Sequence, residues 1–298
     1  MLFFSIKEIL GIEIPALTII DVGAMFEEKE RYAPLVQQGL ANVVGFEPNP
    51  VKLKELREKK REAYRYFPYV LGQGEERVFH ATRYPGCSSL YCPDPSVINL
   101  FSNIGAETGG NFSVIETEPV KTMRLDDVSE CPKSDYVKID VQGAELDILK
   151  GGMEKLSQSL VMELEAEFLP LYKDQPLFGD LQVFLRSHGF VLHKFIDLGG
   201  MGLRPLQSGV NNMSPISQLL WSEAIFVRDF SKIENYSDED LLKASVILHE
   251  IYRSIDLVLY LLREYDRRNA TNLADLYIQE VDKHKQIPLM FMNVRDTY

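Results

Sequence analysis

The chain has 298 residues, 45% of them hydrophobic and 26% charged, and this composition allows a globular protein with a full hydrophobic core. Its formal net charge of -12 argues against non-specific binding to duplex nucleic acid, because that binding depends on neutralising phosphates. The three cysteines form no disulfide framework, the five histidines show no metal-ligand spacing, and no apolar run reaches the roughly 18 residues that span a bilayer.

Two apolar runs near the N-terminus each end in an acid. Residues 16–20 are apolar and β-branched and lead into Asp21 and Gly23, and residues 42–46 lead into Glu47. Buried parallel strands need continuous hydrophobicity, and open α/β sheets bind their ligands at the carboxyl ends of such strands. We therefore predict two parallel strands whose acids lie at a ligand-binding edge.

Helices are predicted after each of these strands. Residues 27–38 predict a short helix, and residues 49–60 predict a second one with Asn49 as its N-cap. A third strand is predicted over residues 66–71, ending at Gly72.

The alternation of strands and helices is then interrupted. Residues 78–82 and 114–117 predict short strands around a stretch rich in Gly, Pro and Ser, residues 84–110. We interpret this part of the chain, about 73–120, as an insertion with hairpins.

Alternation resumes with a strand over residues 136–140, which again ends in an acid. The remaining predictions for this part are helices over 144–150, closed by Gly151 and Gly152, and 178–187, and strands over 160–164, 190–196 and 224–227. Together these elements predict an α/β fold with a seven-stranded, mostly parallel sheet, helices on both faces and an antiparallel closing hairpin.

The last seventy residues have a different pattern. Apolar residues from Leu241 to Tyr265 alternate three and four apart, which predicts one long helix that begins at a capping box formed by Ser237 and Asp240. A second helix over residues 272–285 is its expected packing partner. We expect one domain over 1–230 and a helical extension over 231–298.

The acids at the strand ends suit a cofactor that carries a nucleoside but no pyrophosphate. A carboxylate at Glu47 can accept both ribose hydroxyls. No Gly-x-Gly-x-x-Gly follows the first strand, and Glu27 and Glu28 would repel a pyrophosphate there. These residues disfavour an NAD-dependent dehydrogenase and favour S-adenosylmethionine, whose amino group could meet Asp21.

Several motifs together resemble the FkbM-type methyltransferases. The motifs are Ile20 to Ala24, Val44 to Asn49, Gly86 to Leu90, Arg124 to Asp127 and Val137 to Glu145. The resemblance implies a Rossmann-like class I methyltransferase fold that uses S-adenosylmethionine, usually to methylate a hydroxyl of a sugar, glycolipid or polyketide. The family commonly has an Asn and another Gly where this chain has Met25 and Phe26.

The expected site follows from these motifs. The expected cofactor-binding residues are Asp21, Val22, Gly23, Ala24, Glu47, Pro48, Asn49, Leu71, Gly72 and Asp140.

Methyl transfer to an alcohol needs a group that removes the hydroxyl proton. Asp140 is the candidate base, and Glu163 and His188 are further candidates. Glu145 either favours the dipole of a helix or acts at the site. Ser88 and Ser89 either cap local backbone or contact cofactor and acceptor.

The sequence thus predicts a cytoplasmic O-methyltransferase acting on a small-molecule, sugar or lipid-linked acceptor, without a nucleic-acid partner, transmembrane segment or metal. The alternative is a catalytically silent binding or scaffold protein that assembles through its C-terminal helices, suggested by Met25, Phe26 and the apolar stripe. A homo-oligomer formed through these helices is compatible with either function.

Overall fold

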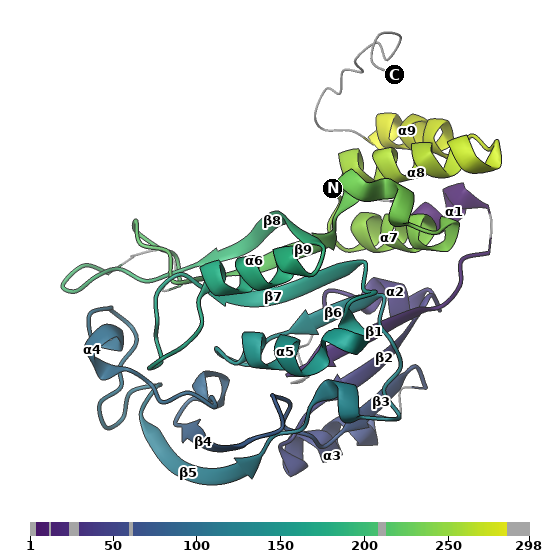
Figure 1. Ribbon diagram of the computed structural model, residues 1–298. Helices are drawn as coiled ribbons and strands as arrows, with labels where there is room; N and C mark the ends of the chain where they lie inside the picture. Colours follow the sequence, from purple (N-terminus) through teal and green to yellow (C-terminus); the bar gives the residue numbers. More distant parts are fainter. Residues whose placement is uncertain (1–3, 12, 24–29, 60–61, 208–212, 285–298) are drawn as a thin grey trace. The chain divides into compact units, whose positions relative to one another are not determined.

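Figure 1 shows a computed structural model of the chain, which describes residues 4–11, 13–23, 30–59, 62–207 and 213–284. The chain divides into two compact units. The first, here called the sheet unit, comprises residues 17–28 and 41–230. The second, the helical unit, comprises residues 1–16, 29–40 and 231–298.

A seven-stranded sheet with the order β3-β2-β1-β6-β7-β9-β8 forms the centre of the sheet unit. Its strands are β1 Leu17–Val22, β2 Ala41–Phe46, β3 Tyr64–Phe67, β6 Tyr136–Ile139, β7 Val161–Glu167, β8 Phe190–Gly199 and β9 Trp221–Arg228. β9 is antiparallel to both β7 and β8, and the other neighbouring strands are parallel. The predicted mostly parallel sheet with an antiparallel closing hairpin is confirmed.

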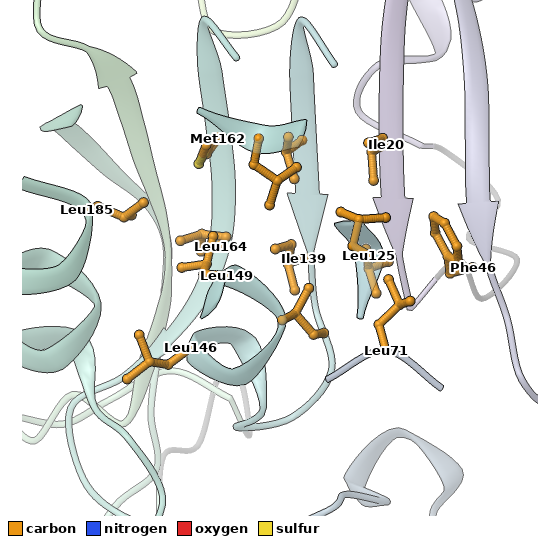
Figure 2. Packing of buried hydrophobic residues seen from close by; sticks show 14 of the residues in the cluster. Ile20, Phe46, Leu71, Leu125, Ile139, Leu146, Leu149, Met162, Leu164 and Leu185 are labelled. Carbon is orange, nitrogen blue, oxygen red and sulfur yellow. The ribbon is translucent and has the colours of Figure 1, made fainter. Parts of the chain in front are cut away.

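Helices cover both faces of this sheet. Figure 2 shows α5 (Glu145–Leu156) and α6 (Phe178–Ser187) on one face, where Leu149 and Leu185 pack in the same cluster as Ile139 of β6. On the other face, α3 (Pro50–Glu58) packs Leu53 and Leu56 against Tyr66 of β3. The face assignment follows from strand alternation, because Phe67, next to Tyr66, belongs to the α5 and α6 cluster.

Several predicted boundaries in the sheet unit are wrong: the strand predicted over 160–164 extends to Glu167 as β7, and two further boundaries concern the third strand and the helix after β6. The third strand ends at Phe67 and not at Leu71, which makes only a single parallel bridge with Met123. Gly151 and Gly152 do not end the helix after β6, because α5 continues through them to Leu156.

The reason that α5 contains these glycines is close packing. A Cβ on Gly151 would lie 2.0 Å from the carbonyl oxygen of Gly72, and a Cβ on Gly152 would lie 2.9 Å from Leu125 Cδ2. Glycine is therefore required where the helix contacts the backbone of the neighbouring segment, and it does not mark a helix end here.

The insertion contains a second, two-stranded sheet, which Figure 1 shows apart from the main one. β4 (Glu76–Thr82) and β5 (Val114–Lys121) pair antiparallel, and the segment between them holds the 3-10 turn η1 (Pro85–Cys87) and the short helix α4 (Pro95–Ile98). A further 3-10 turn, η2 (Leu125–Asp127), follows β5.

Asp147 of α5 fixes the insertion to the rest of the sheet unit. Its carboxylate lies 3.1 Å from Arg77 Nη1 and accepts a hydrogen bond of 2.8 Å from the Tyr91 hydroxyl. The Arg77 guanidinium also lies over the Tyr91 ring, 4.7 Å from its centroid. This charge-assisted cluster holds the insertion against the helix that follows β6.

The helical unit contains the C-terminal helices. Its elements are α1 Ile6–Leu10, α2 Ala33–Gln37, α7 Asp238–Glu250, α8 Ile255–Asn269 and α9 Leu273–His284, and the 3-10 segment η3 Phe230–Asn235 leads into it. α2 is shorter than the helix predicted over 27–38, and residues 24–29 lie outside the described part of the chain.

One long C-terminal helix was the wrong prediction. The apolar stripe is divided between α7 and α8, which pack on each other, and the chain turns between them at Arg253, whose φ is +51°. The capping box is confirmed, because Asp240 N donates to Ser237 Oγ at 3.1 Å and Ser237 N donates to an Asp240 carboxylate oxygen at 3.0 Å. No helix in the described ranges is both long enough and apolar enough to cross a bilayer.

Candidate functional site

A cavity of about 170 Å³ lies at the carboxyl ends of β1, β2 and β6. Six of the expected cofactor-binding residues line it, namely Val22, Gly23, Glu47, Pro48, Leu71 and Asp140. The inserted segment supplies a further part of its wall through Phe79, Pro85, Gly86, Ser88 and Leu90. This cavity, here called the first cavity, is where an open α/β sheet would bind a ligand.

Gly23 adopts a conformation that only glycine takes easily. Its φ is +82°, and a Cβ built on it would lie 2.0 Å from the carbonyl oxygen of Asp140. Asp140 N in turn donates to the carbonyl oxygen of Val22 at 3.1 Å. The ends of β1 and β6 are therefore in direct backbone contact, and a bare backbone borders the cavity at Gly23.

Glu47 brings a buried carboxylate to the same cavity. Its side chain is 4% exposed, and Oε1 accepts a hydrogen bond of 2.6 Å from the backbone N–H of Asn49. Burial raises the pKa of Glu47 above its ordinary value, although the Asn49 N–H and the charge of Lys52 act in the opposite direction. Glu47 therefore keeps one carboxylate oxygen on the Asn49 N–H while its side chain borders the cavity.

Other expected site residues do not line the first cavity. Asp21 is buried at the end of β1, and Asn49 caps α3 by accepting hydrogen bonds from the N–H groups of Val51 and Lys52. Gly72 packs against α5 as described above. Ala24, and with it Met25 and Phe26, lies outside the described residues.

Asp140 begins a tight loop that leads into α5. Lys138 Nζ lies 3.5 Å from its Oδ2, and Gln142 Nε2 donates to its Oδ1 at 3.4 Å. Gln142 has a positive φ of 59°, which is uncommon for a residue with a side chain. The loop thus directs the Gln142 amide back towards the Asp140 carboxylate.

Glu145 holds this loop in place. Its Oε1 accepts hydrogen bonds from the backbone N–H groups of Val141, at 3.0 Å, and Gly143, at 3.2 Å. Burial raises the pKa of Glu145 to about 7, although these N–H groups favour the charged form. Glu145 does more than favour the dipole of α5, because it closes the loop that carries Asp140 and Gln142.

A second cavity of about 370 Å³ adjoins the first. Both are lined by Gly86 and Gln142. The second cavity has apolar and aromatic walls and two acids, Glu165 and Glu167, from β7. Two cavities that share part of their wall can hold two reactants side by side, as a transfer reaction requires.

The two β7 acids are electrostatically unusual. Burial raises the pKa of each well above its ordinary value, and the charge of Asp140 raises it further. Gln142 Nε2 donates to Glu165 Oε2 at 2.5 Å, and the Gln142 carbonyl group of the side chain accepts from the Tyr172 hydroxyl at 3.4 Å. Gln142 therefore connects the acid of the first cavity, Asp140, with an acid of the second.

The remaining candidates from the sequence lie elsewhere or act locally. Glu163 is fully buried and accepts a hydrogen bond of 2.9 Å from the Tyr136 hydroxyl, and His188 bonds the carbonyl of Phe184 at the end of α6; neither lines a cavity described above. Ser88 lines the first cavity, and Ser89 donates to the backbone carbonyl of Gln142 at 2.6 Å.

Gln142, Glu165 and Glu167 are not among the site residues expected from the sequence. A signal for the two glutamates was present, because Glu163, Glu165 and Glu167 alternate with Leu164 and Ala166. In a strand, a period of two places such acids on one face. Their position at the end of an otherwise apolar strand could therefore have indicated a polar site.

Comparison with known proteins gives a consistent assignment for this part of the chain. The model of the Methyltransferase FkbM domain family matches residues 21–192. A curated protein of Jannaschia sp. (strain CCS1), named "Putative methyltransferase", is 28% identical over 148 residues. That match covers 50% of this chain and 45% of the relative, so the chain aligns with less than half of that protein.

Parts of the chain also match solved structures at low identity and low TM-score. Precorrin-6y C5,15-methyltransferase from Geobacter metallireducens GS-15 matches with a TM-score of 0.35 and 14% identity, over 75% of this chain and 85% of that one. TrmK of M. capricolum, in complex with S-adenosyl-homocysteine, matches with a TM-score of 0.34 and 13% identity, over 94% and 99% of the two chains.

Proposed function

Since the chain belongs to the FkbM methyltransferase domain family, we propose that it transfers a methyl group from S-adenosylmethionine to a hydroxyl of a small-molecule, sugar or lipid-linked acceptor. The observation that carries this proposal is the pair of adjoining cavities at the carboxyl edge of the sheet, with Glu47 and Asp140 in the first. One cavity would take the cofactor and the other the acceptor.

The first cavity has the chemistry that this cofactor needs. Gly23 offers bare backbone, and the Glu47 carboxylate can accept hydrogen bonds from ribose hydroxyls. The described residues that line the cavity include no Lys, Arg or His, which suits a cofactor without phosphate groups. Asp21, Ala24, Asn49 and Gly72, which are not among the lining residues, stay predictions for cofactor contacts.

Asp140 is the proposed base. S-adenosylmethionine supplies a methyl group bound to a positively charged sulfur. When the acceptor oxygen takes this methyl group and the sulfur keeps the electron pair of the broken bond, the Asp140 carboxylate would accept the hydroxyl proton. Lys138 and Gln142, at 3.5 Å and 3.4 Å, would hold this carboxylate beside the first cavity, and Gln142 also lines the second.

Binding of the cofactor product tests the first half of the proposal. Calorimetric titration with S-adenosylhomocysteine should give saturable binding, and Glu47→Ala should weaken it by roughly 1–3 kcal/mol, because a hydrogen bond to a charged group is lost. Glu58→Ala, which removes an exposed acid at the end of α3, is the matched control and should bind as the wild type does. Absence of binding to folded wild-type protein at millimolar ligand would refute the proposal.

The acceptor chemistry is tested by methyl labelling. The wild type and Asp140→Asn are each incubated with methyl-labelled S-adenosylmethionine and a cell extract. We expect labelled products only with the wild type, and we expect the label to resist alkali and to be released by hot hydriodic acid, as an ether methyl is. Label that alkali removes would indicate an ester and contradict methylation of a hydroxyl.

A further inference from the structure

The second cavity is lined by apolar and aromatic side chains, which suit an organic ring, and by two acids, which suit a positively charged group. Trp221 and Phe112 contribute aromatic surface, and Leu171 and Met201 add aliphatic and thioether surface. The polar groups are mainly side-chain carboxyls and amides, with Glu165 and Glu167 supplied by alternate positions of β7, which lie on the same face of the strand. Such a mixture of apolar walls and a few converging polar groups is typical of a ligand site.

Glu167 lines this cavity with a buried carboxylate. The residue is 3% exposed, and the side chain of Gln175 interacts with its carboxylate, but among the described residues none donates a hydrogen bond of normal geometry to Oε2. A buried carboxylate oxygen without a donor costs free energy unless a ligand supplies one. The cavity at this oxygen is therefore a place where a donor group of a ligand would be stabilised.

No positive side chain offsets the acids of the second cavity. The described residues that line it include neither Lys, Arg nor His. Glu165 and Glu167 line the second cavity but not the first, so a positive group that favours their ionised forms would lie on the acceptor side and not beside the proposed cofactor.

We propose that the methyl acceptor bound in the second cavity carries a positive charge, as an organic amine does at neutral pH, in addition to the hydroxyl that is methylated. The proposal rests on the proposed function above. An ammonium group would donate to Glu167 Oε2 and lie near Glu165, and the Trp221 ring, which also lines the cavity, can add attraction for a cation. A nearby positive charge favours the ionised form of these carboxyl groups, whereas a neutral acceptor would give no such charge pairing and an anionic acceptor would oppose their ionisation.

A set of probes matched in shape tests the charge of the ligand. Cyclohexylamine, cyclohexanol and cyclohexanecarboxylate differ in one group and are each titrated into protein saturated with S-adenosylhomocysteine, with binding followed by saturation-transfer NMR. We expect the ammonium probe to bind at least tenfold more tightly than the alcohol, and the carboxylate to bind least. Equal affinity for the alcohol, tighter binding of the carboxylate, or no binding of the ammonium probe at millimolar concentration would each overturn the proposal.

Substitutions of the two acids test whether the ammonium probe binds in the second cavity. Glu167→Gln and Glu165→Gln keep side-chain size and remove one charge each, so both should weaken binding of cyclohexylammonium several-fold. Glu118→Gln removes an exposed charge from β5 and should leave that binding unchanged. If one of the two cavity variants fails to fold, the other variant is used together with the relative affinities of the three probes for the wild type. Unchanged binding of cyclohexylammonium to a folded cavity variant contradicts the proposal.

The two proposals fail in different ways. Loss of S-adenosylhomocysteine binding in the wild type would refute the methyltransferase proposal itself. Retained S-adenosylhomocysteine binding without preference for the ammonium probe would refute only the charge assigned to the acceptor.

Discussion

Gly23 lies at the end of β1, in contact with the backbone of Asp140, and lines the first cavity. A side chain there would place its Cβ 2.0 Å from the Asp140 carbonyl oxygen in addition to straining a φ of +82°. Gly189 has nearly the same φ, +83°, but a Cβ on it meets nothing within 4 Å. Comparing alanine substitutions at these two glycines therefore distinguishes the cost of the positive φ, which both share, from the cost of the steric clash, which only Gly23 would have.

We expect Gly189→Ala to lower the free energy of unfolding by about 1–2 kcal/mol, which is the cost of the left-handed conformation for a residue with a Cβ. Gly23→Ala should lower the free energy of unfolding clearly more, because the ends of β1 and β6 must separate to admit the Cβ. For the same reason it should abolish binding of S-adenosylhomocysteine, whereas Gly189→Ala should not. Urea unfolding and calorimetric titration of both variants measure this. Wild-type binding by Gly23→Ala would show that the close contact does not shape the site.

Glu145 predicts a pH dependence of stability. Burial raises its pKa from 4.5 to about 7 in the folded protein. Between these two values the folded protein holds the proton and the unfolded chain releases it, so the contribution of Glu145 to the free energy of unfolding falls as pH rises through this window. A shift of this size corresponds to about 3 kcal/mol.

Glu145→Gln removes this contribution while its amide oxygen can still accept from Val141 and Gly143. Relative to the wild type, the variant should therefore gain stability as pH rises from about 4.5 to about 7, by at most about 3 kcal/mol. Urea titrations across this range give the difference, with Glu118→Gln as an exposed control. A difference that does not change with pH would contradict the buried, proton-holding state of Glu145.

At the scale of elements, α5 can pack closely on the loop at Gly72 because Gly151 has no side chain. Gly151 lies in the helix interior, where alanine would normally stabilise by about 1 kcal/mol. Because its Cβ would lie 2.0 Å from the Gly72 carbonyl oxygen, helix and loop must separate to admit one.

We therefore expect Gly151→Ala to destabilise the protein by about 2 kcal/mol or more, opposite in sign to its helix propensity. Gly179, in the first turn of α6, has open space around a Cβ, so Gly179→Ala should be neutral or stabilising by up to about 1 kcal/mol. Thermal and urea unfolding compare the two. Equal effects in both variants would show that α5 is not held by this contact.

At the scale of the whole molecule, segments far apart in the chain build one compact unit. In the helical unit, the Glu250 carboxylate accepts hydrogen bonds from Ser5 Oγ at 2.8 Å, from the backbone N–H of Ile6 at 2.8 Å and from Gln38 Nε2 at 3.2 Å. Glu250 is 6% exposed at the end of α7. One buried carboxylate thus holds the N-terminal segment, the segment after α2 and the C-terminal helices.

Glu250→Ala should remove the acceptor of the Ile6 N–H and of Gln38 Nε2, while the Ser5 hydroxyl keeps Gln38 Oε1, and lower the free energy of unfolding by about 2–4 kcal/mol, by analogy with buried charged hydrogen bonds. Hydrogen exchange should then speed up in α1. Glu250→Gln, which can still accept from Ile6, should have a smaller effect on both measurements. Unchanged exchange in α1 of the alanine variant would mean that apolar packing alone holds the N-terminal segment.

Much of the fold could be predicted from the sequence because the strands are short, apolar and end in acids or glycines. The runs before Asp21, Glu47 and Asp140 became β1, β2 and β6. The prediction of one long C-terminal helix was wrong because apolar residues have the same spacing in one straight helix and in two helices that turn at Arg253 and pack on each other. Periodicity shows which face is buried, but not what buries it.

The sequence by itself determined the order of elements, the acids at the strand ends and the family motifs. Tertiary structure decided that Glu47 and Asp140 border one cavity while Asp21 and Asn49 do not line it, and that Gln142, Glu165 and Glu167 form part of a second. The physical reason is that local patterns depend on neighbours in the chain. Cavities depend instead on sheet register, on the approach of α5 to Gly72 and on the inserted segment, which bring together residues far apart in the sequence.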